Sequence, residues 1–63
     1  MAIIFVNYDA EDNLLDITIR YNGKKTDHDR WEAWDMYQVL LSLGHRPIIL
    51  TRPDGGRTEM MTY

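Results

Sequence analysis

The chain contains no cysteine, so neither a disulfide nor a zinc–thiolate site contributes to its stability. It also has no apolar run of about 18 residues, the length needed to cross a membrane. Its N-terminus lacks the basic start and small-residue cleavage site of a signal peptide. These absences predict a protein of a reducing compartment, without a membrane partner, and we expect it to be cytoplasmic.

The short length limits how much core the chain builds. With 63 residues we expect a single domain, residues 1–63, without linkers or repeats. A chain of this size buries about 60% of the surface that its unfolded form exposes. We therefore expect close packing, self-association or a bound partner to supply part of its stability.

Basic residues are few, since 7 Lys and Arg stand against 10 Asp and Glu and give a formal net charge of −3. The acids are concentrated at residues 9–16 and 27–35, around the first turn and the start of the predicted helix. The chain therefore lacks a broad basic face for phosphate groups, and nucleic acid is not the expected partner. Most of these acids solvate a turn or complement the helix dipole, where each contributes about 0.3–1 kcal/mol.

Hydrophobic periodicity predicts strands at both ends of the chain. Residues 2–8 form the first, and Leu15, Ile17, Ile19 and Tyr21 alternate with polar residues in the second. Asn22-Gly23 is a strong turn signal. After this turn the chain either returns briefly in an extended conformation through Lys24 and Lys25 or leads directly to the helix. Residues 48–52 and 57–63 form a hairpin closed by Pro53-Asp54-Gly55-Gly56.

The one predicted helix runs over residues 28–43 and ends at Gly44. Thr26 with Asp29, or Asp29 with Glu32, supplies a capping box at its start. One arc of this helix is apolar and is expected to be buried: Ala33, Trp34, Met36, Tyr37, Leu40, Leu41 and Gly44. Trp31 falls on the opposite, polar side, with Asp35, Gln38 and Ser42.

These elements predict an α+β fold, a ββαββ two-layer domain with a four-stranded antiparallel sheet and one helix on one face. A right-handed crossover through the helix gives the strand order 2-1-3-4, in which the first strand is central and the last lies at an edge. Three stretches are apolar on both sides: 3–6, 48–50 and 60–61. A single helix covers only one face, so we predict that the second face is covered by something else. Both alternate sets of the first strand are apolar, which leaves open the set that meets the helix.

No constellation in the sequence has the specificity of a catalytic or metal motif. His28 lies between Asp27 and Asp29, a weak carboxylate and imidazole cluster that capping and solvation explain more simply. Ser42, His45 and Asp35 are the residue types of a catalytic triad, but nothing places them in a pocket. We therefore predict a protein that is not an enzyme and has no cofactor and no metal site.

Trp31 is the strongest candidate for an interaction site, because a tryptophan surrounded by polar residues is typical of an interface anchor. The alternative is that it folds back over Lys24 and Lys25 as a cation–π cap. The predicted partner-binding residues are Trp31, Asp35, Gln38, Asp27, Asp29 and Glu32.

Two hairpin tips carry bases that are candidates for phosphate contacts: Arg52, Arg57, Lys24 and Lys25. In such a complex Tyr21 or Trp31 would stack on a nucleobase. Cross-strand pairing with Glu59, or solubility alone, is the simpler role of these bases.

Together these features predict a small, acidic, non-enzymatic protein-binding module. In size and charge the chain resembles inhibitors encoded by phages or mobile elements, including anti-CRISPR and anti-restriction proteins. That resemblance implies an inhibitor that occupies a surface of a larger host complex. The exposed acids at residues 27–35 are expected to engage a basic, nucleic-acid-binding surface of that complex by matching the spacing of phosphates. One alternative is a homodimeric structural or regulatory domain, in which a second copy covers the surplus sheet face or an edge strand. Another is a weak nucleic-acid binder that uses the hairpin tips.

Overall fold

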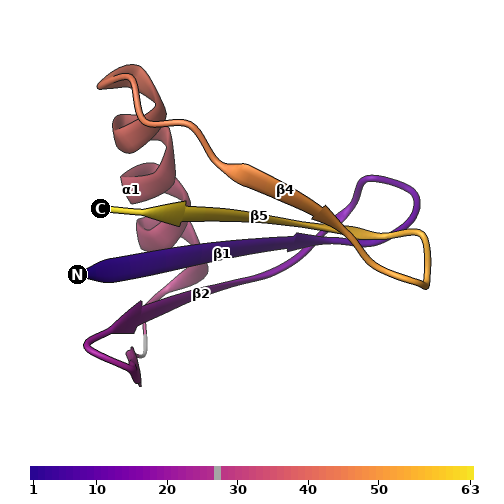
Figure 1. Ribbon diagram of the computed structural model, residues 1–63, viewed down its shortest axis with the longest axis horizontal. Coiled ribbons are helices and arrows are strands. Elements are labelled where there is room, and N and C mark those ends of the chain that lie inside the picture. The colour runs from indigo at the N-terminus through magenta and orange to yellow at the C-terminus, as the bar shows by residue number, and fades with distance from the viewer. Residues whose placement is uncertain (27) are drawn as a thin grey trace.

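One helix lies across one face of a five-stranded antiparallel sheet (Figure 1). The computed structural model describes residues 1–26 and 28–63, so Asp27, one of the predicted partner-binding residues, lies outside the described residues. In chain order the elements are β1 (Ala2–Tyr8), β2 (Leu14–Tyr21), β3 (Lys24–Thr26), α1 (Arg30–Ser42), β4 (Ile48–Thr51) and β5 (Arg57–Thr62). The predicted α+β class is confirmed.

The predicted strand number and order are wrong. The short return through Lys24 and Lys25 forms a fifth strand, β3, and the observed order is β3-β2-β1-β5-β4. The last strand, β5, is therefore central and β4 lies at the edge, the reverse of the prediction. β5 pairs with β1 along its whole length and with β4 on its other side. The longer strand thus has backbone partners on both sides, and the four-residue β4 is left outside.

The length of α1 explains why β4 is at the far edge. The chain enters α1 from β3 at one edge of the sheet, and Figure 1 shows α1 running across the strands. Its 13 residues span about 20 Å. Five strands have four spacings between them and measure about 19 Å from edge to edge. The helix therefore carries the chain across the whole sheet and delivers it to the opposite edge.

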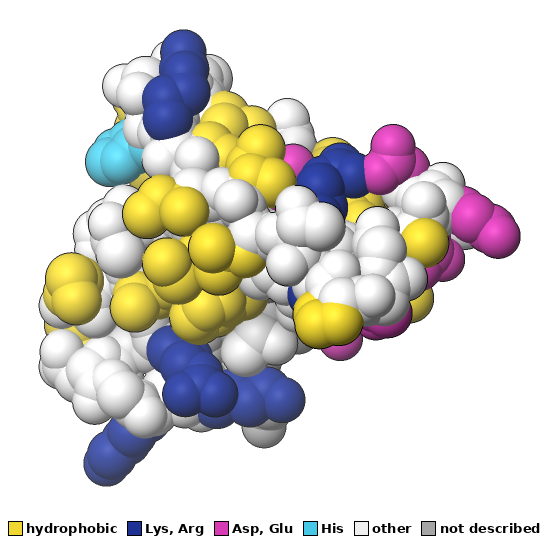
Figure 2. All heavy atoms as spheres, turned by 45° about the vertical axis from the view of Figure 1, so that its right-hand side comes forward, with side chains coloured by type: hydrophobic (Ala, Val, Ile, Leu, Met, Phe, Trp, Pro, Cys, Tyr) yellow, Lys and Arg dark blue, Asp and Glu magenta, His cyan; other side chains and the backbone are white. Residues whose placement is uncertain are grey.

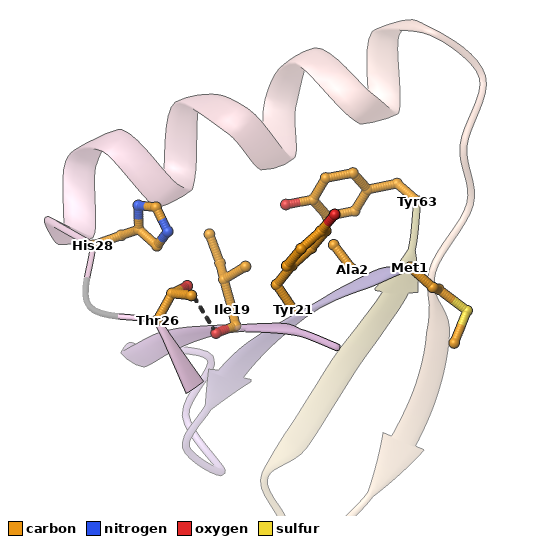
Figure 3. A pocket seen from close by; sticks show the side chains of 7 residues that line it. All are labelled: Met1, Ala2, Ile19, Tyr21, Thr26, His28 and Tyr63. Atoms are coloured by element: carbon orange, nitrogen blue, oxygen red, sulfur yellow. Dashed lines mark hydrogen bonds between the residues drawn. The ribbon is translucent and has the colours of Figure 1, made fainter. Parts of the chain in front are cut away.

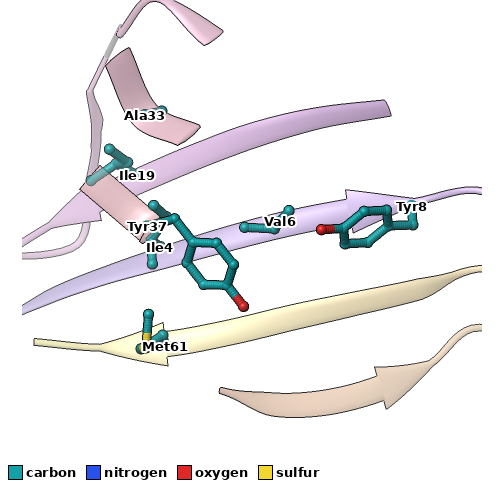
Figure 4. Packing of buried hydrophobic residues seen from close by; sticks show 7 residues of the cluster. All are labelled: Ile4, Val6, Tyr8, Ile19, Ala33, Tyr37 and Met61. Atoms are coloured by element: carbon teal, nitrogen blue, oxygen red, sulfur yellow. The ribbon is translucent and has the colours of Figure 1, made fainter. Parts of the chain in front are cut away.

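The core lies between α1 and the middle of the sheet (Figure 4). Its buried members are Ile4, Val6, Tyr8, Ile19, Met61, Ala33 and Tyr37. The β1 set of Ile4 and Val6 thus meets the helix, and Ile3 and Phe5 point to the other face. Ala33 is almost completely buried, and its small side chain lets α1 lie close to the sheet.

The ends of α1 follow from local chemistry. Asp29 is the N-cap, and its carboxylate accepts a hydrogen bond from the Trp31 backbone N–H at 2.9 Å. After the helix, Gly44 has a φ of 96°, a conformation that favours glycine. The predicted buried arc is confirmed except at Gly44, which is exposed beyond the end of α1; Trp34, Met36, Leu40 and Leu41 all pack against the core beside Ala33 and Tyr37. Among the described residues, no helix is long and apolar enough to cross a membrane.

Arg52 fastens the β4–β5 hairpin to the end of β1. Its Nη2 donates a hydrogen bond to the Tyr8 carbonyl, and its Nη1 donates to the Arg57 carbonyl at 2.9 Å and to Thr58 Oγ1 at 3.2 Å. Gly56 is buried beside this guanidinium. A Cβ at Gly56 would lie 2.5 Å from the Tyr8 carbonyl oxygen, so the close approach of the two segments requires glycine.

On the side of β5 that faces α1, a side-chain hydrogen bond joins the strand to the helix. The Tyr37 hydroxyl donates to Glu59 Oε2 at 2.7 Å, so the buried tyrosine has a partner for its hydroxyl. Burial raises the pKa of Tyr37, and the hydrogen bond to the Glu59 carboxylate raises it further. The phenol therefore stays protonated and remains a donor at neutral pH.

We predict that Gly56→Ala destabilises the fold by about 1–3 kcal/mol or more, because the new methyl group has no space between Arg52 and the Tyr8 carbonyl. Gly23→Ala is the control, since nothing lies within 4 Å of its Cβ position and only its positive φ opposes the change. Urea unfolding of both variants measures the difference. A Gly56→Ala variant as stable as Gly23→Ala would contradict the Arg52 arrangement.

Ile3 and Ile4 are a matched pair on opposite faces of β1. We predict that Ile4→Ala lowers the free energy of unfolding by about 2–5 kcal/mol, because Ile4 is fully buried under α1. Ile3→Ala, on the uncovered face, is expected to lower it by about 1 kcal/mol or less. Thermal or urea unfolding followed by circular dichroism compares the two, and equal losses would mean that both faces are covered.

Candidate functional site

The sheet face opposite α1 carries an apolar surface. β1 directs Ile3 and Phe5 to this face, and the register places Met60 beside Phe5 and Ile48 beside Met60. We call this surface the open-face patch and define it by five residues: Ile3, Phe5, Ile48, Leu50 and Met60. Ile48 and Leu50 are 59% and 48% exposed, while the other members are half-buried. Figure 2 shows hydrophobic side chains gathered over the middle of the molecule.

Basic side chains border the open-face patch on one side. The register places Arg20 opposite Ile3 and Lys25 opposite Arg20, so both project from the same face as the patch. The Arg20 guanidinium lies 5.9 Å from the centroid of the Phe5 ring. In Figure 2 basic side chains lie directly below the hydrophobic group, while acidic ones gather at the right-hand end.

The other end of the same face is polar and internally hydrogen-bonded. Thr58 Oγ1 donates to Asn7 Oδ1 at 2.6 Å, and Asn7 Nδ2 donates to Asp16 Oδ1 at 2.6 Å. Between these hydrogen-bonded side chains and the open-face patch is a hollow of about 280 Å³, which is lined by Phe5, Asn7, Thr18, Arg20 and Thr58. An apolar centre with a polar and charged border has the composition of a protein interface.

The polar side of α1, on which helical spacing places Trp31, is exposed to solvent. Trp31 is 69% exposed, and Asp35 and Gln38 follow it on the same side of α1. At this exposure Trp31 does not cover the core. Asp29 is occupied as the N-cap, and Glu32 Oε1 lies 3.7 Å from His28 Nδ1. The predicted residues that are described thus form an acidic surface around one tryptophan.

The bases predicted to contact phosphates are not brought together. Tyr21, at the start of the β3 hairpin, pairs with Ala2, whereas Arg57 pairs with Tyr8, so the two hairpin tips lie at opposite ends of β1. Arg57 forms ion pairs with Asp12 and with Glu59, and its guanidinium lies 4.0 Å from the Tyr8 ring centroid.

Internal partners thus occupy both arginines of the β4–β5 tip. Arg52 adds an ion pair with Asp54, 3.3 Å away, to its bonds with backbone carbonyls. Lys24 and Lys25 are exposed on opposite faces of β3. Arg57 thus pairs with Glu59 as the simpler reading expected, but both residues lie in β5, so the contact is made within one strand and the predicted cross-strand geometry is wrong.

Sequence reasoning missed a small apolar pocket beside the start of α1 (Figure 3). It holds about 340 Å³ and is lined by Met1, Ala2, Ile19, Tyr21, Thr26, His28 and Tyr63. Thr26 Oγ1 donates to the Ile19 carbonyl at 3.1 Å, and burial raises the pKa of Tyr63. These residues come from both chain ends, from β2 and β3, and from the segment just before α1, so no local pattern in the sequence marks the pocket.

The described part of the chain, residues 1–26 and 28–63, contains no group of three or more His, Asp or Glu side chains placed to hold a metal ion. No protein-family model, curated protein or solved structure matches this chain. The function of this protein therefore has to be inferred from the open-face patch and the exposed helix surface.

The two tryptophans provide a direct test of the exposed helix surface. We predict that Trp31→Ala changes the free energy of unfolding by no more than about 0.5 kcal/mol, since Trp31 is mostly in solvent. Trp34→Ala is expected to lower it by about 2–3 kcal/mol, because Trp34 packs against the core. Chemical unfolding gives both values, and acrylamide quenching should be stronger for Trp31 than for Trp34. A large loss of stability in Trp31→Ala would show that this side chain is structural.

Proposed function

We propose that this protein is a small non-enzymatic module that binds a larger protein through the open-face patch. One observation carries the proposal: on the uncovered face of the sheet Ile48 and Leu50 are 59% and 48% exposed, with Ile48 beside Met60 and Met60 beside Phe5. Burial of apolar surface contributes about 25 cal/mol per Å² to binding free energy. A complementary partner that covers this face would therefore form a stable complex. On a free monomer the same exposed patch would promote aggregation.

The border of the patch indicates the chemistry of the partner. Arg20 and Lys25 favour an apolar contact surface that has Asp or Glu side chains along one side. At the opposite end, the hydrogen-bonded side chains of Asn7, Asp16 and Thr58 supply polar groups in fixed positions. Such charged and polar borders set the orientation and the rate of association, while the apolar centre supplies affinity.

The acidic surface of α1 supports a second candidate, the inhibitor hypothesis. Trp31 is exposed, with Asp35 beside it and Glu32 in the first turn of the helix. An aromatic anchor surrounded by acids suits a basic surface of a host complex, including one that binds nucleic acid. Under this hypothesis the partner meets the helix, not the sheet.

Affinity capture with two matched variants separates the two surfaces. Phe5→Gln removes the aromatic centre of the open-face patch, and Trp31→Ala removes the anchor of the helix surface. For proteins captured by the wild type, we predict at least a tenfold loss of affinity in Phe5→Gln, about 1.4 kcal/mol or more, and little change in Trp31→Ala. Circular dichroism and thermal unfolding establish that both variants are folded.

The reverse pattern, with loss in Trp31→Ala only, would favour the inhibitor hypothesis over the open-face patch. Equal capture by the wild type and both variants would contradict both surfaces. Hydrogen exchange of the complex adds a positional readout, because the amides of β1 and β5 are expected to be protected if the sheet face is the contact.

A further inference from the structure

The two edges of the sheet differ in their protection. β3 has only three residues, two of them the exposed lysines Lys24 and Lys25, and charged, short strands are how proteins usually protect an edge. β4 has no charged residue and all four of its residues are exposed. Ile49, on the α1 side, is 58% exposed, so β4 is apolar on both of its faces. Of the described residues, none in β4 belongs to the buried core.

The backbone groups at the free edge follow from the hairpin register. Arg52 N–H donates to the Gly56 carbonyl at 2.8 Å, and Leu50 lies opposite Thr58. In an antiparallel ladder the hydrogen-bonded residues alternate, so the N–H and C=O groups of Leu50 and Ile48 point to β5. Those of Ile49 and Thr51 therefore point outward, at the edge.

Prolines limit this edge on both sides. Pro47 directly precedes β4, and Pro53 follows Arg52 in the turn that the hydrogen bond from the Gly55 N–H to the Arg52 carbonyl closes. Proline has no N–H and cannot donate to an added strand. An incoming strand thus meets complete backbone partners only at Ile49 and Thr51.

We propose that β4 of a second copy of this chain pairs antiparallel with this edge across a twofold axis. If Ile49 pairs with the second copy's Thr51, every outward N–H and C=O of the two strands gains a partner. A register that pairs Ile49 with itself places Thr51 opposite Pro47, and one that pairs Thr51 with itself places Ile49 opposite Pro53. Both of these leave outward N–H or C=O groups unpaired, so the edge is most complementary to itself in one register.

Apolar side chains support the same register. The axis passes between Leu50 and the second copy's Leu50, which then cover each other on the open face. Leu50 is 48% exposed in a single copy, so this contact removes apolar surface from water.

The joined sheet leaves both helices on one side and both open-face patches on the other, because the axis is perpendicular to the sheet. The inference does not depend on the proposed function, since the patches stay accessible and become one larger surface. β4 pairing with a second copy is thus compatible with a bound partner on the sheet face.

Charge substitutions at the axis test the proposal. We expect the wild type to be a dimer by analytical ultracentrifugation. Leu50→Lys and Leu50→Glu should each be monomeric, because like charges then oppose each other across the axis. An equimolar mixture of the two variants should again form a dimer. Val39→Lys, at an exposed apolar site on α1, is the control that should leave the dimer intact.

Hydrogen exchange provides a second measurement that does not depend on variants. In the dimer the amides of Ile49 and Thr51 should exchange at least tenfold more slowly than in diluted monomer, while the amides of Ile48 and Leu50 are protected in both states. A wild type that remains monomeric at about 1 mM would overturn the proposal. So would a dimer that persists in Leu50→Lys, or lysine and glutamate variants that fail to recombine. If the dimer fails while Phe5→Gln still loses capture, only this inference is rejected.

Discussion

A single helix has to cover a five-stranded sheet, and the rest of the structure depends on how little of the sheet it reaches. A helix buries one stripe of side chains, so α1 encloses Ile4, Val6, Ile19 and Met61 and leaves the opposite face without a layer. Two-layer folds remain stable in this form when the second face is polar. Here the second face has an apolar centre, and that mismatch is the physical basis of the proposed function.

The direction of α1 decides the second feature, the unprotected edge. Because the helix crosses the strands from β3 to β4, it contributes its buried residues to the middle of the sheet and leaves β4 exposed on both faces. The hairpin that contains β4 is held through β5, which pairs with β1 and buries Met61, and by two polar contacts: Arg52 bonds to the Tyr8 carbonyl, and Glu59 accepts from Tyr37. Together these contacts fix the position of β5 and thereby the register and the outward-pointing groups of β4.

The sequence predicts that an uncovered apolar face exists, but it does not show which residues form that face. The count of two-sided apolar stretches against one amphipathic helix predicts a surplus apolar face. Its members could not be named, because Ile3 and Phe5 are as hydrophobic as Ile4 and Val6. The exposure of Trp31 follows from helical spacing alone. The internal pairing of Arg57 with Asp12 was not predictable, since it joins residues 45 apart in the sequence.

The sequence left the start of α1 open between a Thr26 and an Asp29 cap, and the structure begins the helix at Arg30 after Asp29. Local sequence patterns were sufficient for the α+β class, the extent of β1, the end of α1 before Gly44, and the existence of an uncovered face. These depend on local propensity, capping and periodicity, which neighbouring residues express without tertiary contacts. Long-range strand pairing was needed to establish that β5 is central, that β4 is the free edge, and that Ile3 and Phe5 face away from α1. These depend on which distant strands pair and in which register, and the short local patterns of 63 residues are compatible with more than one pairing.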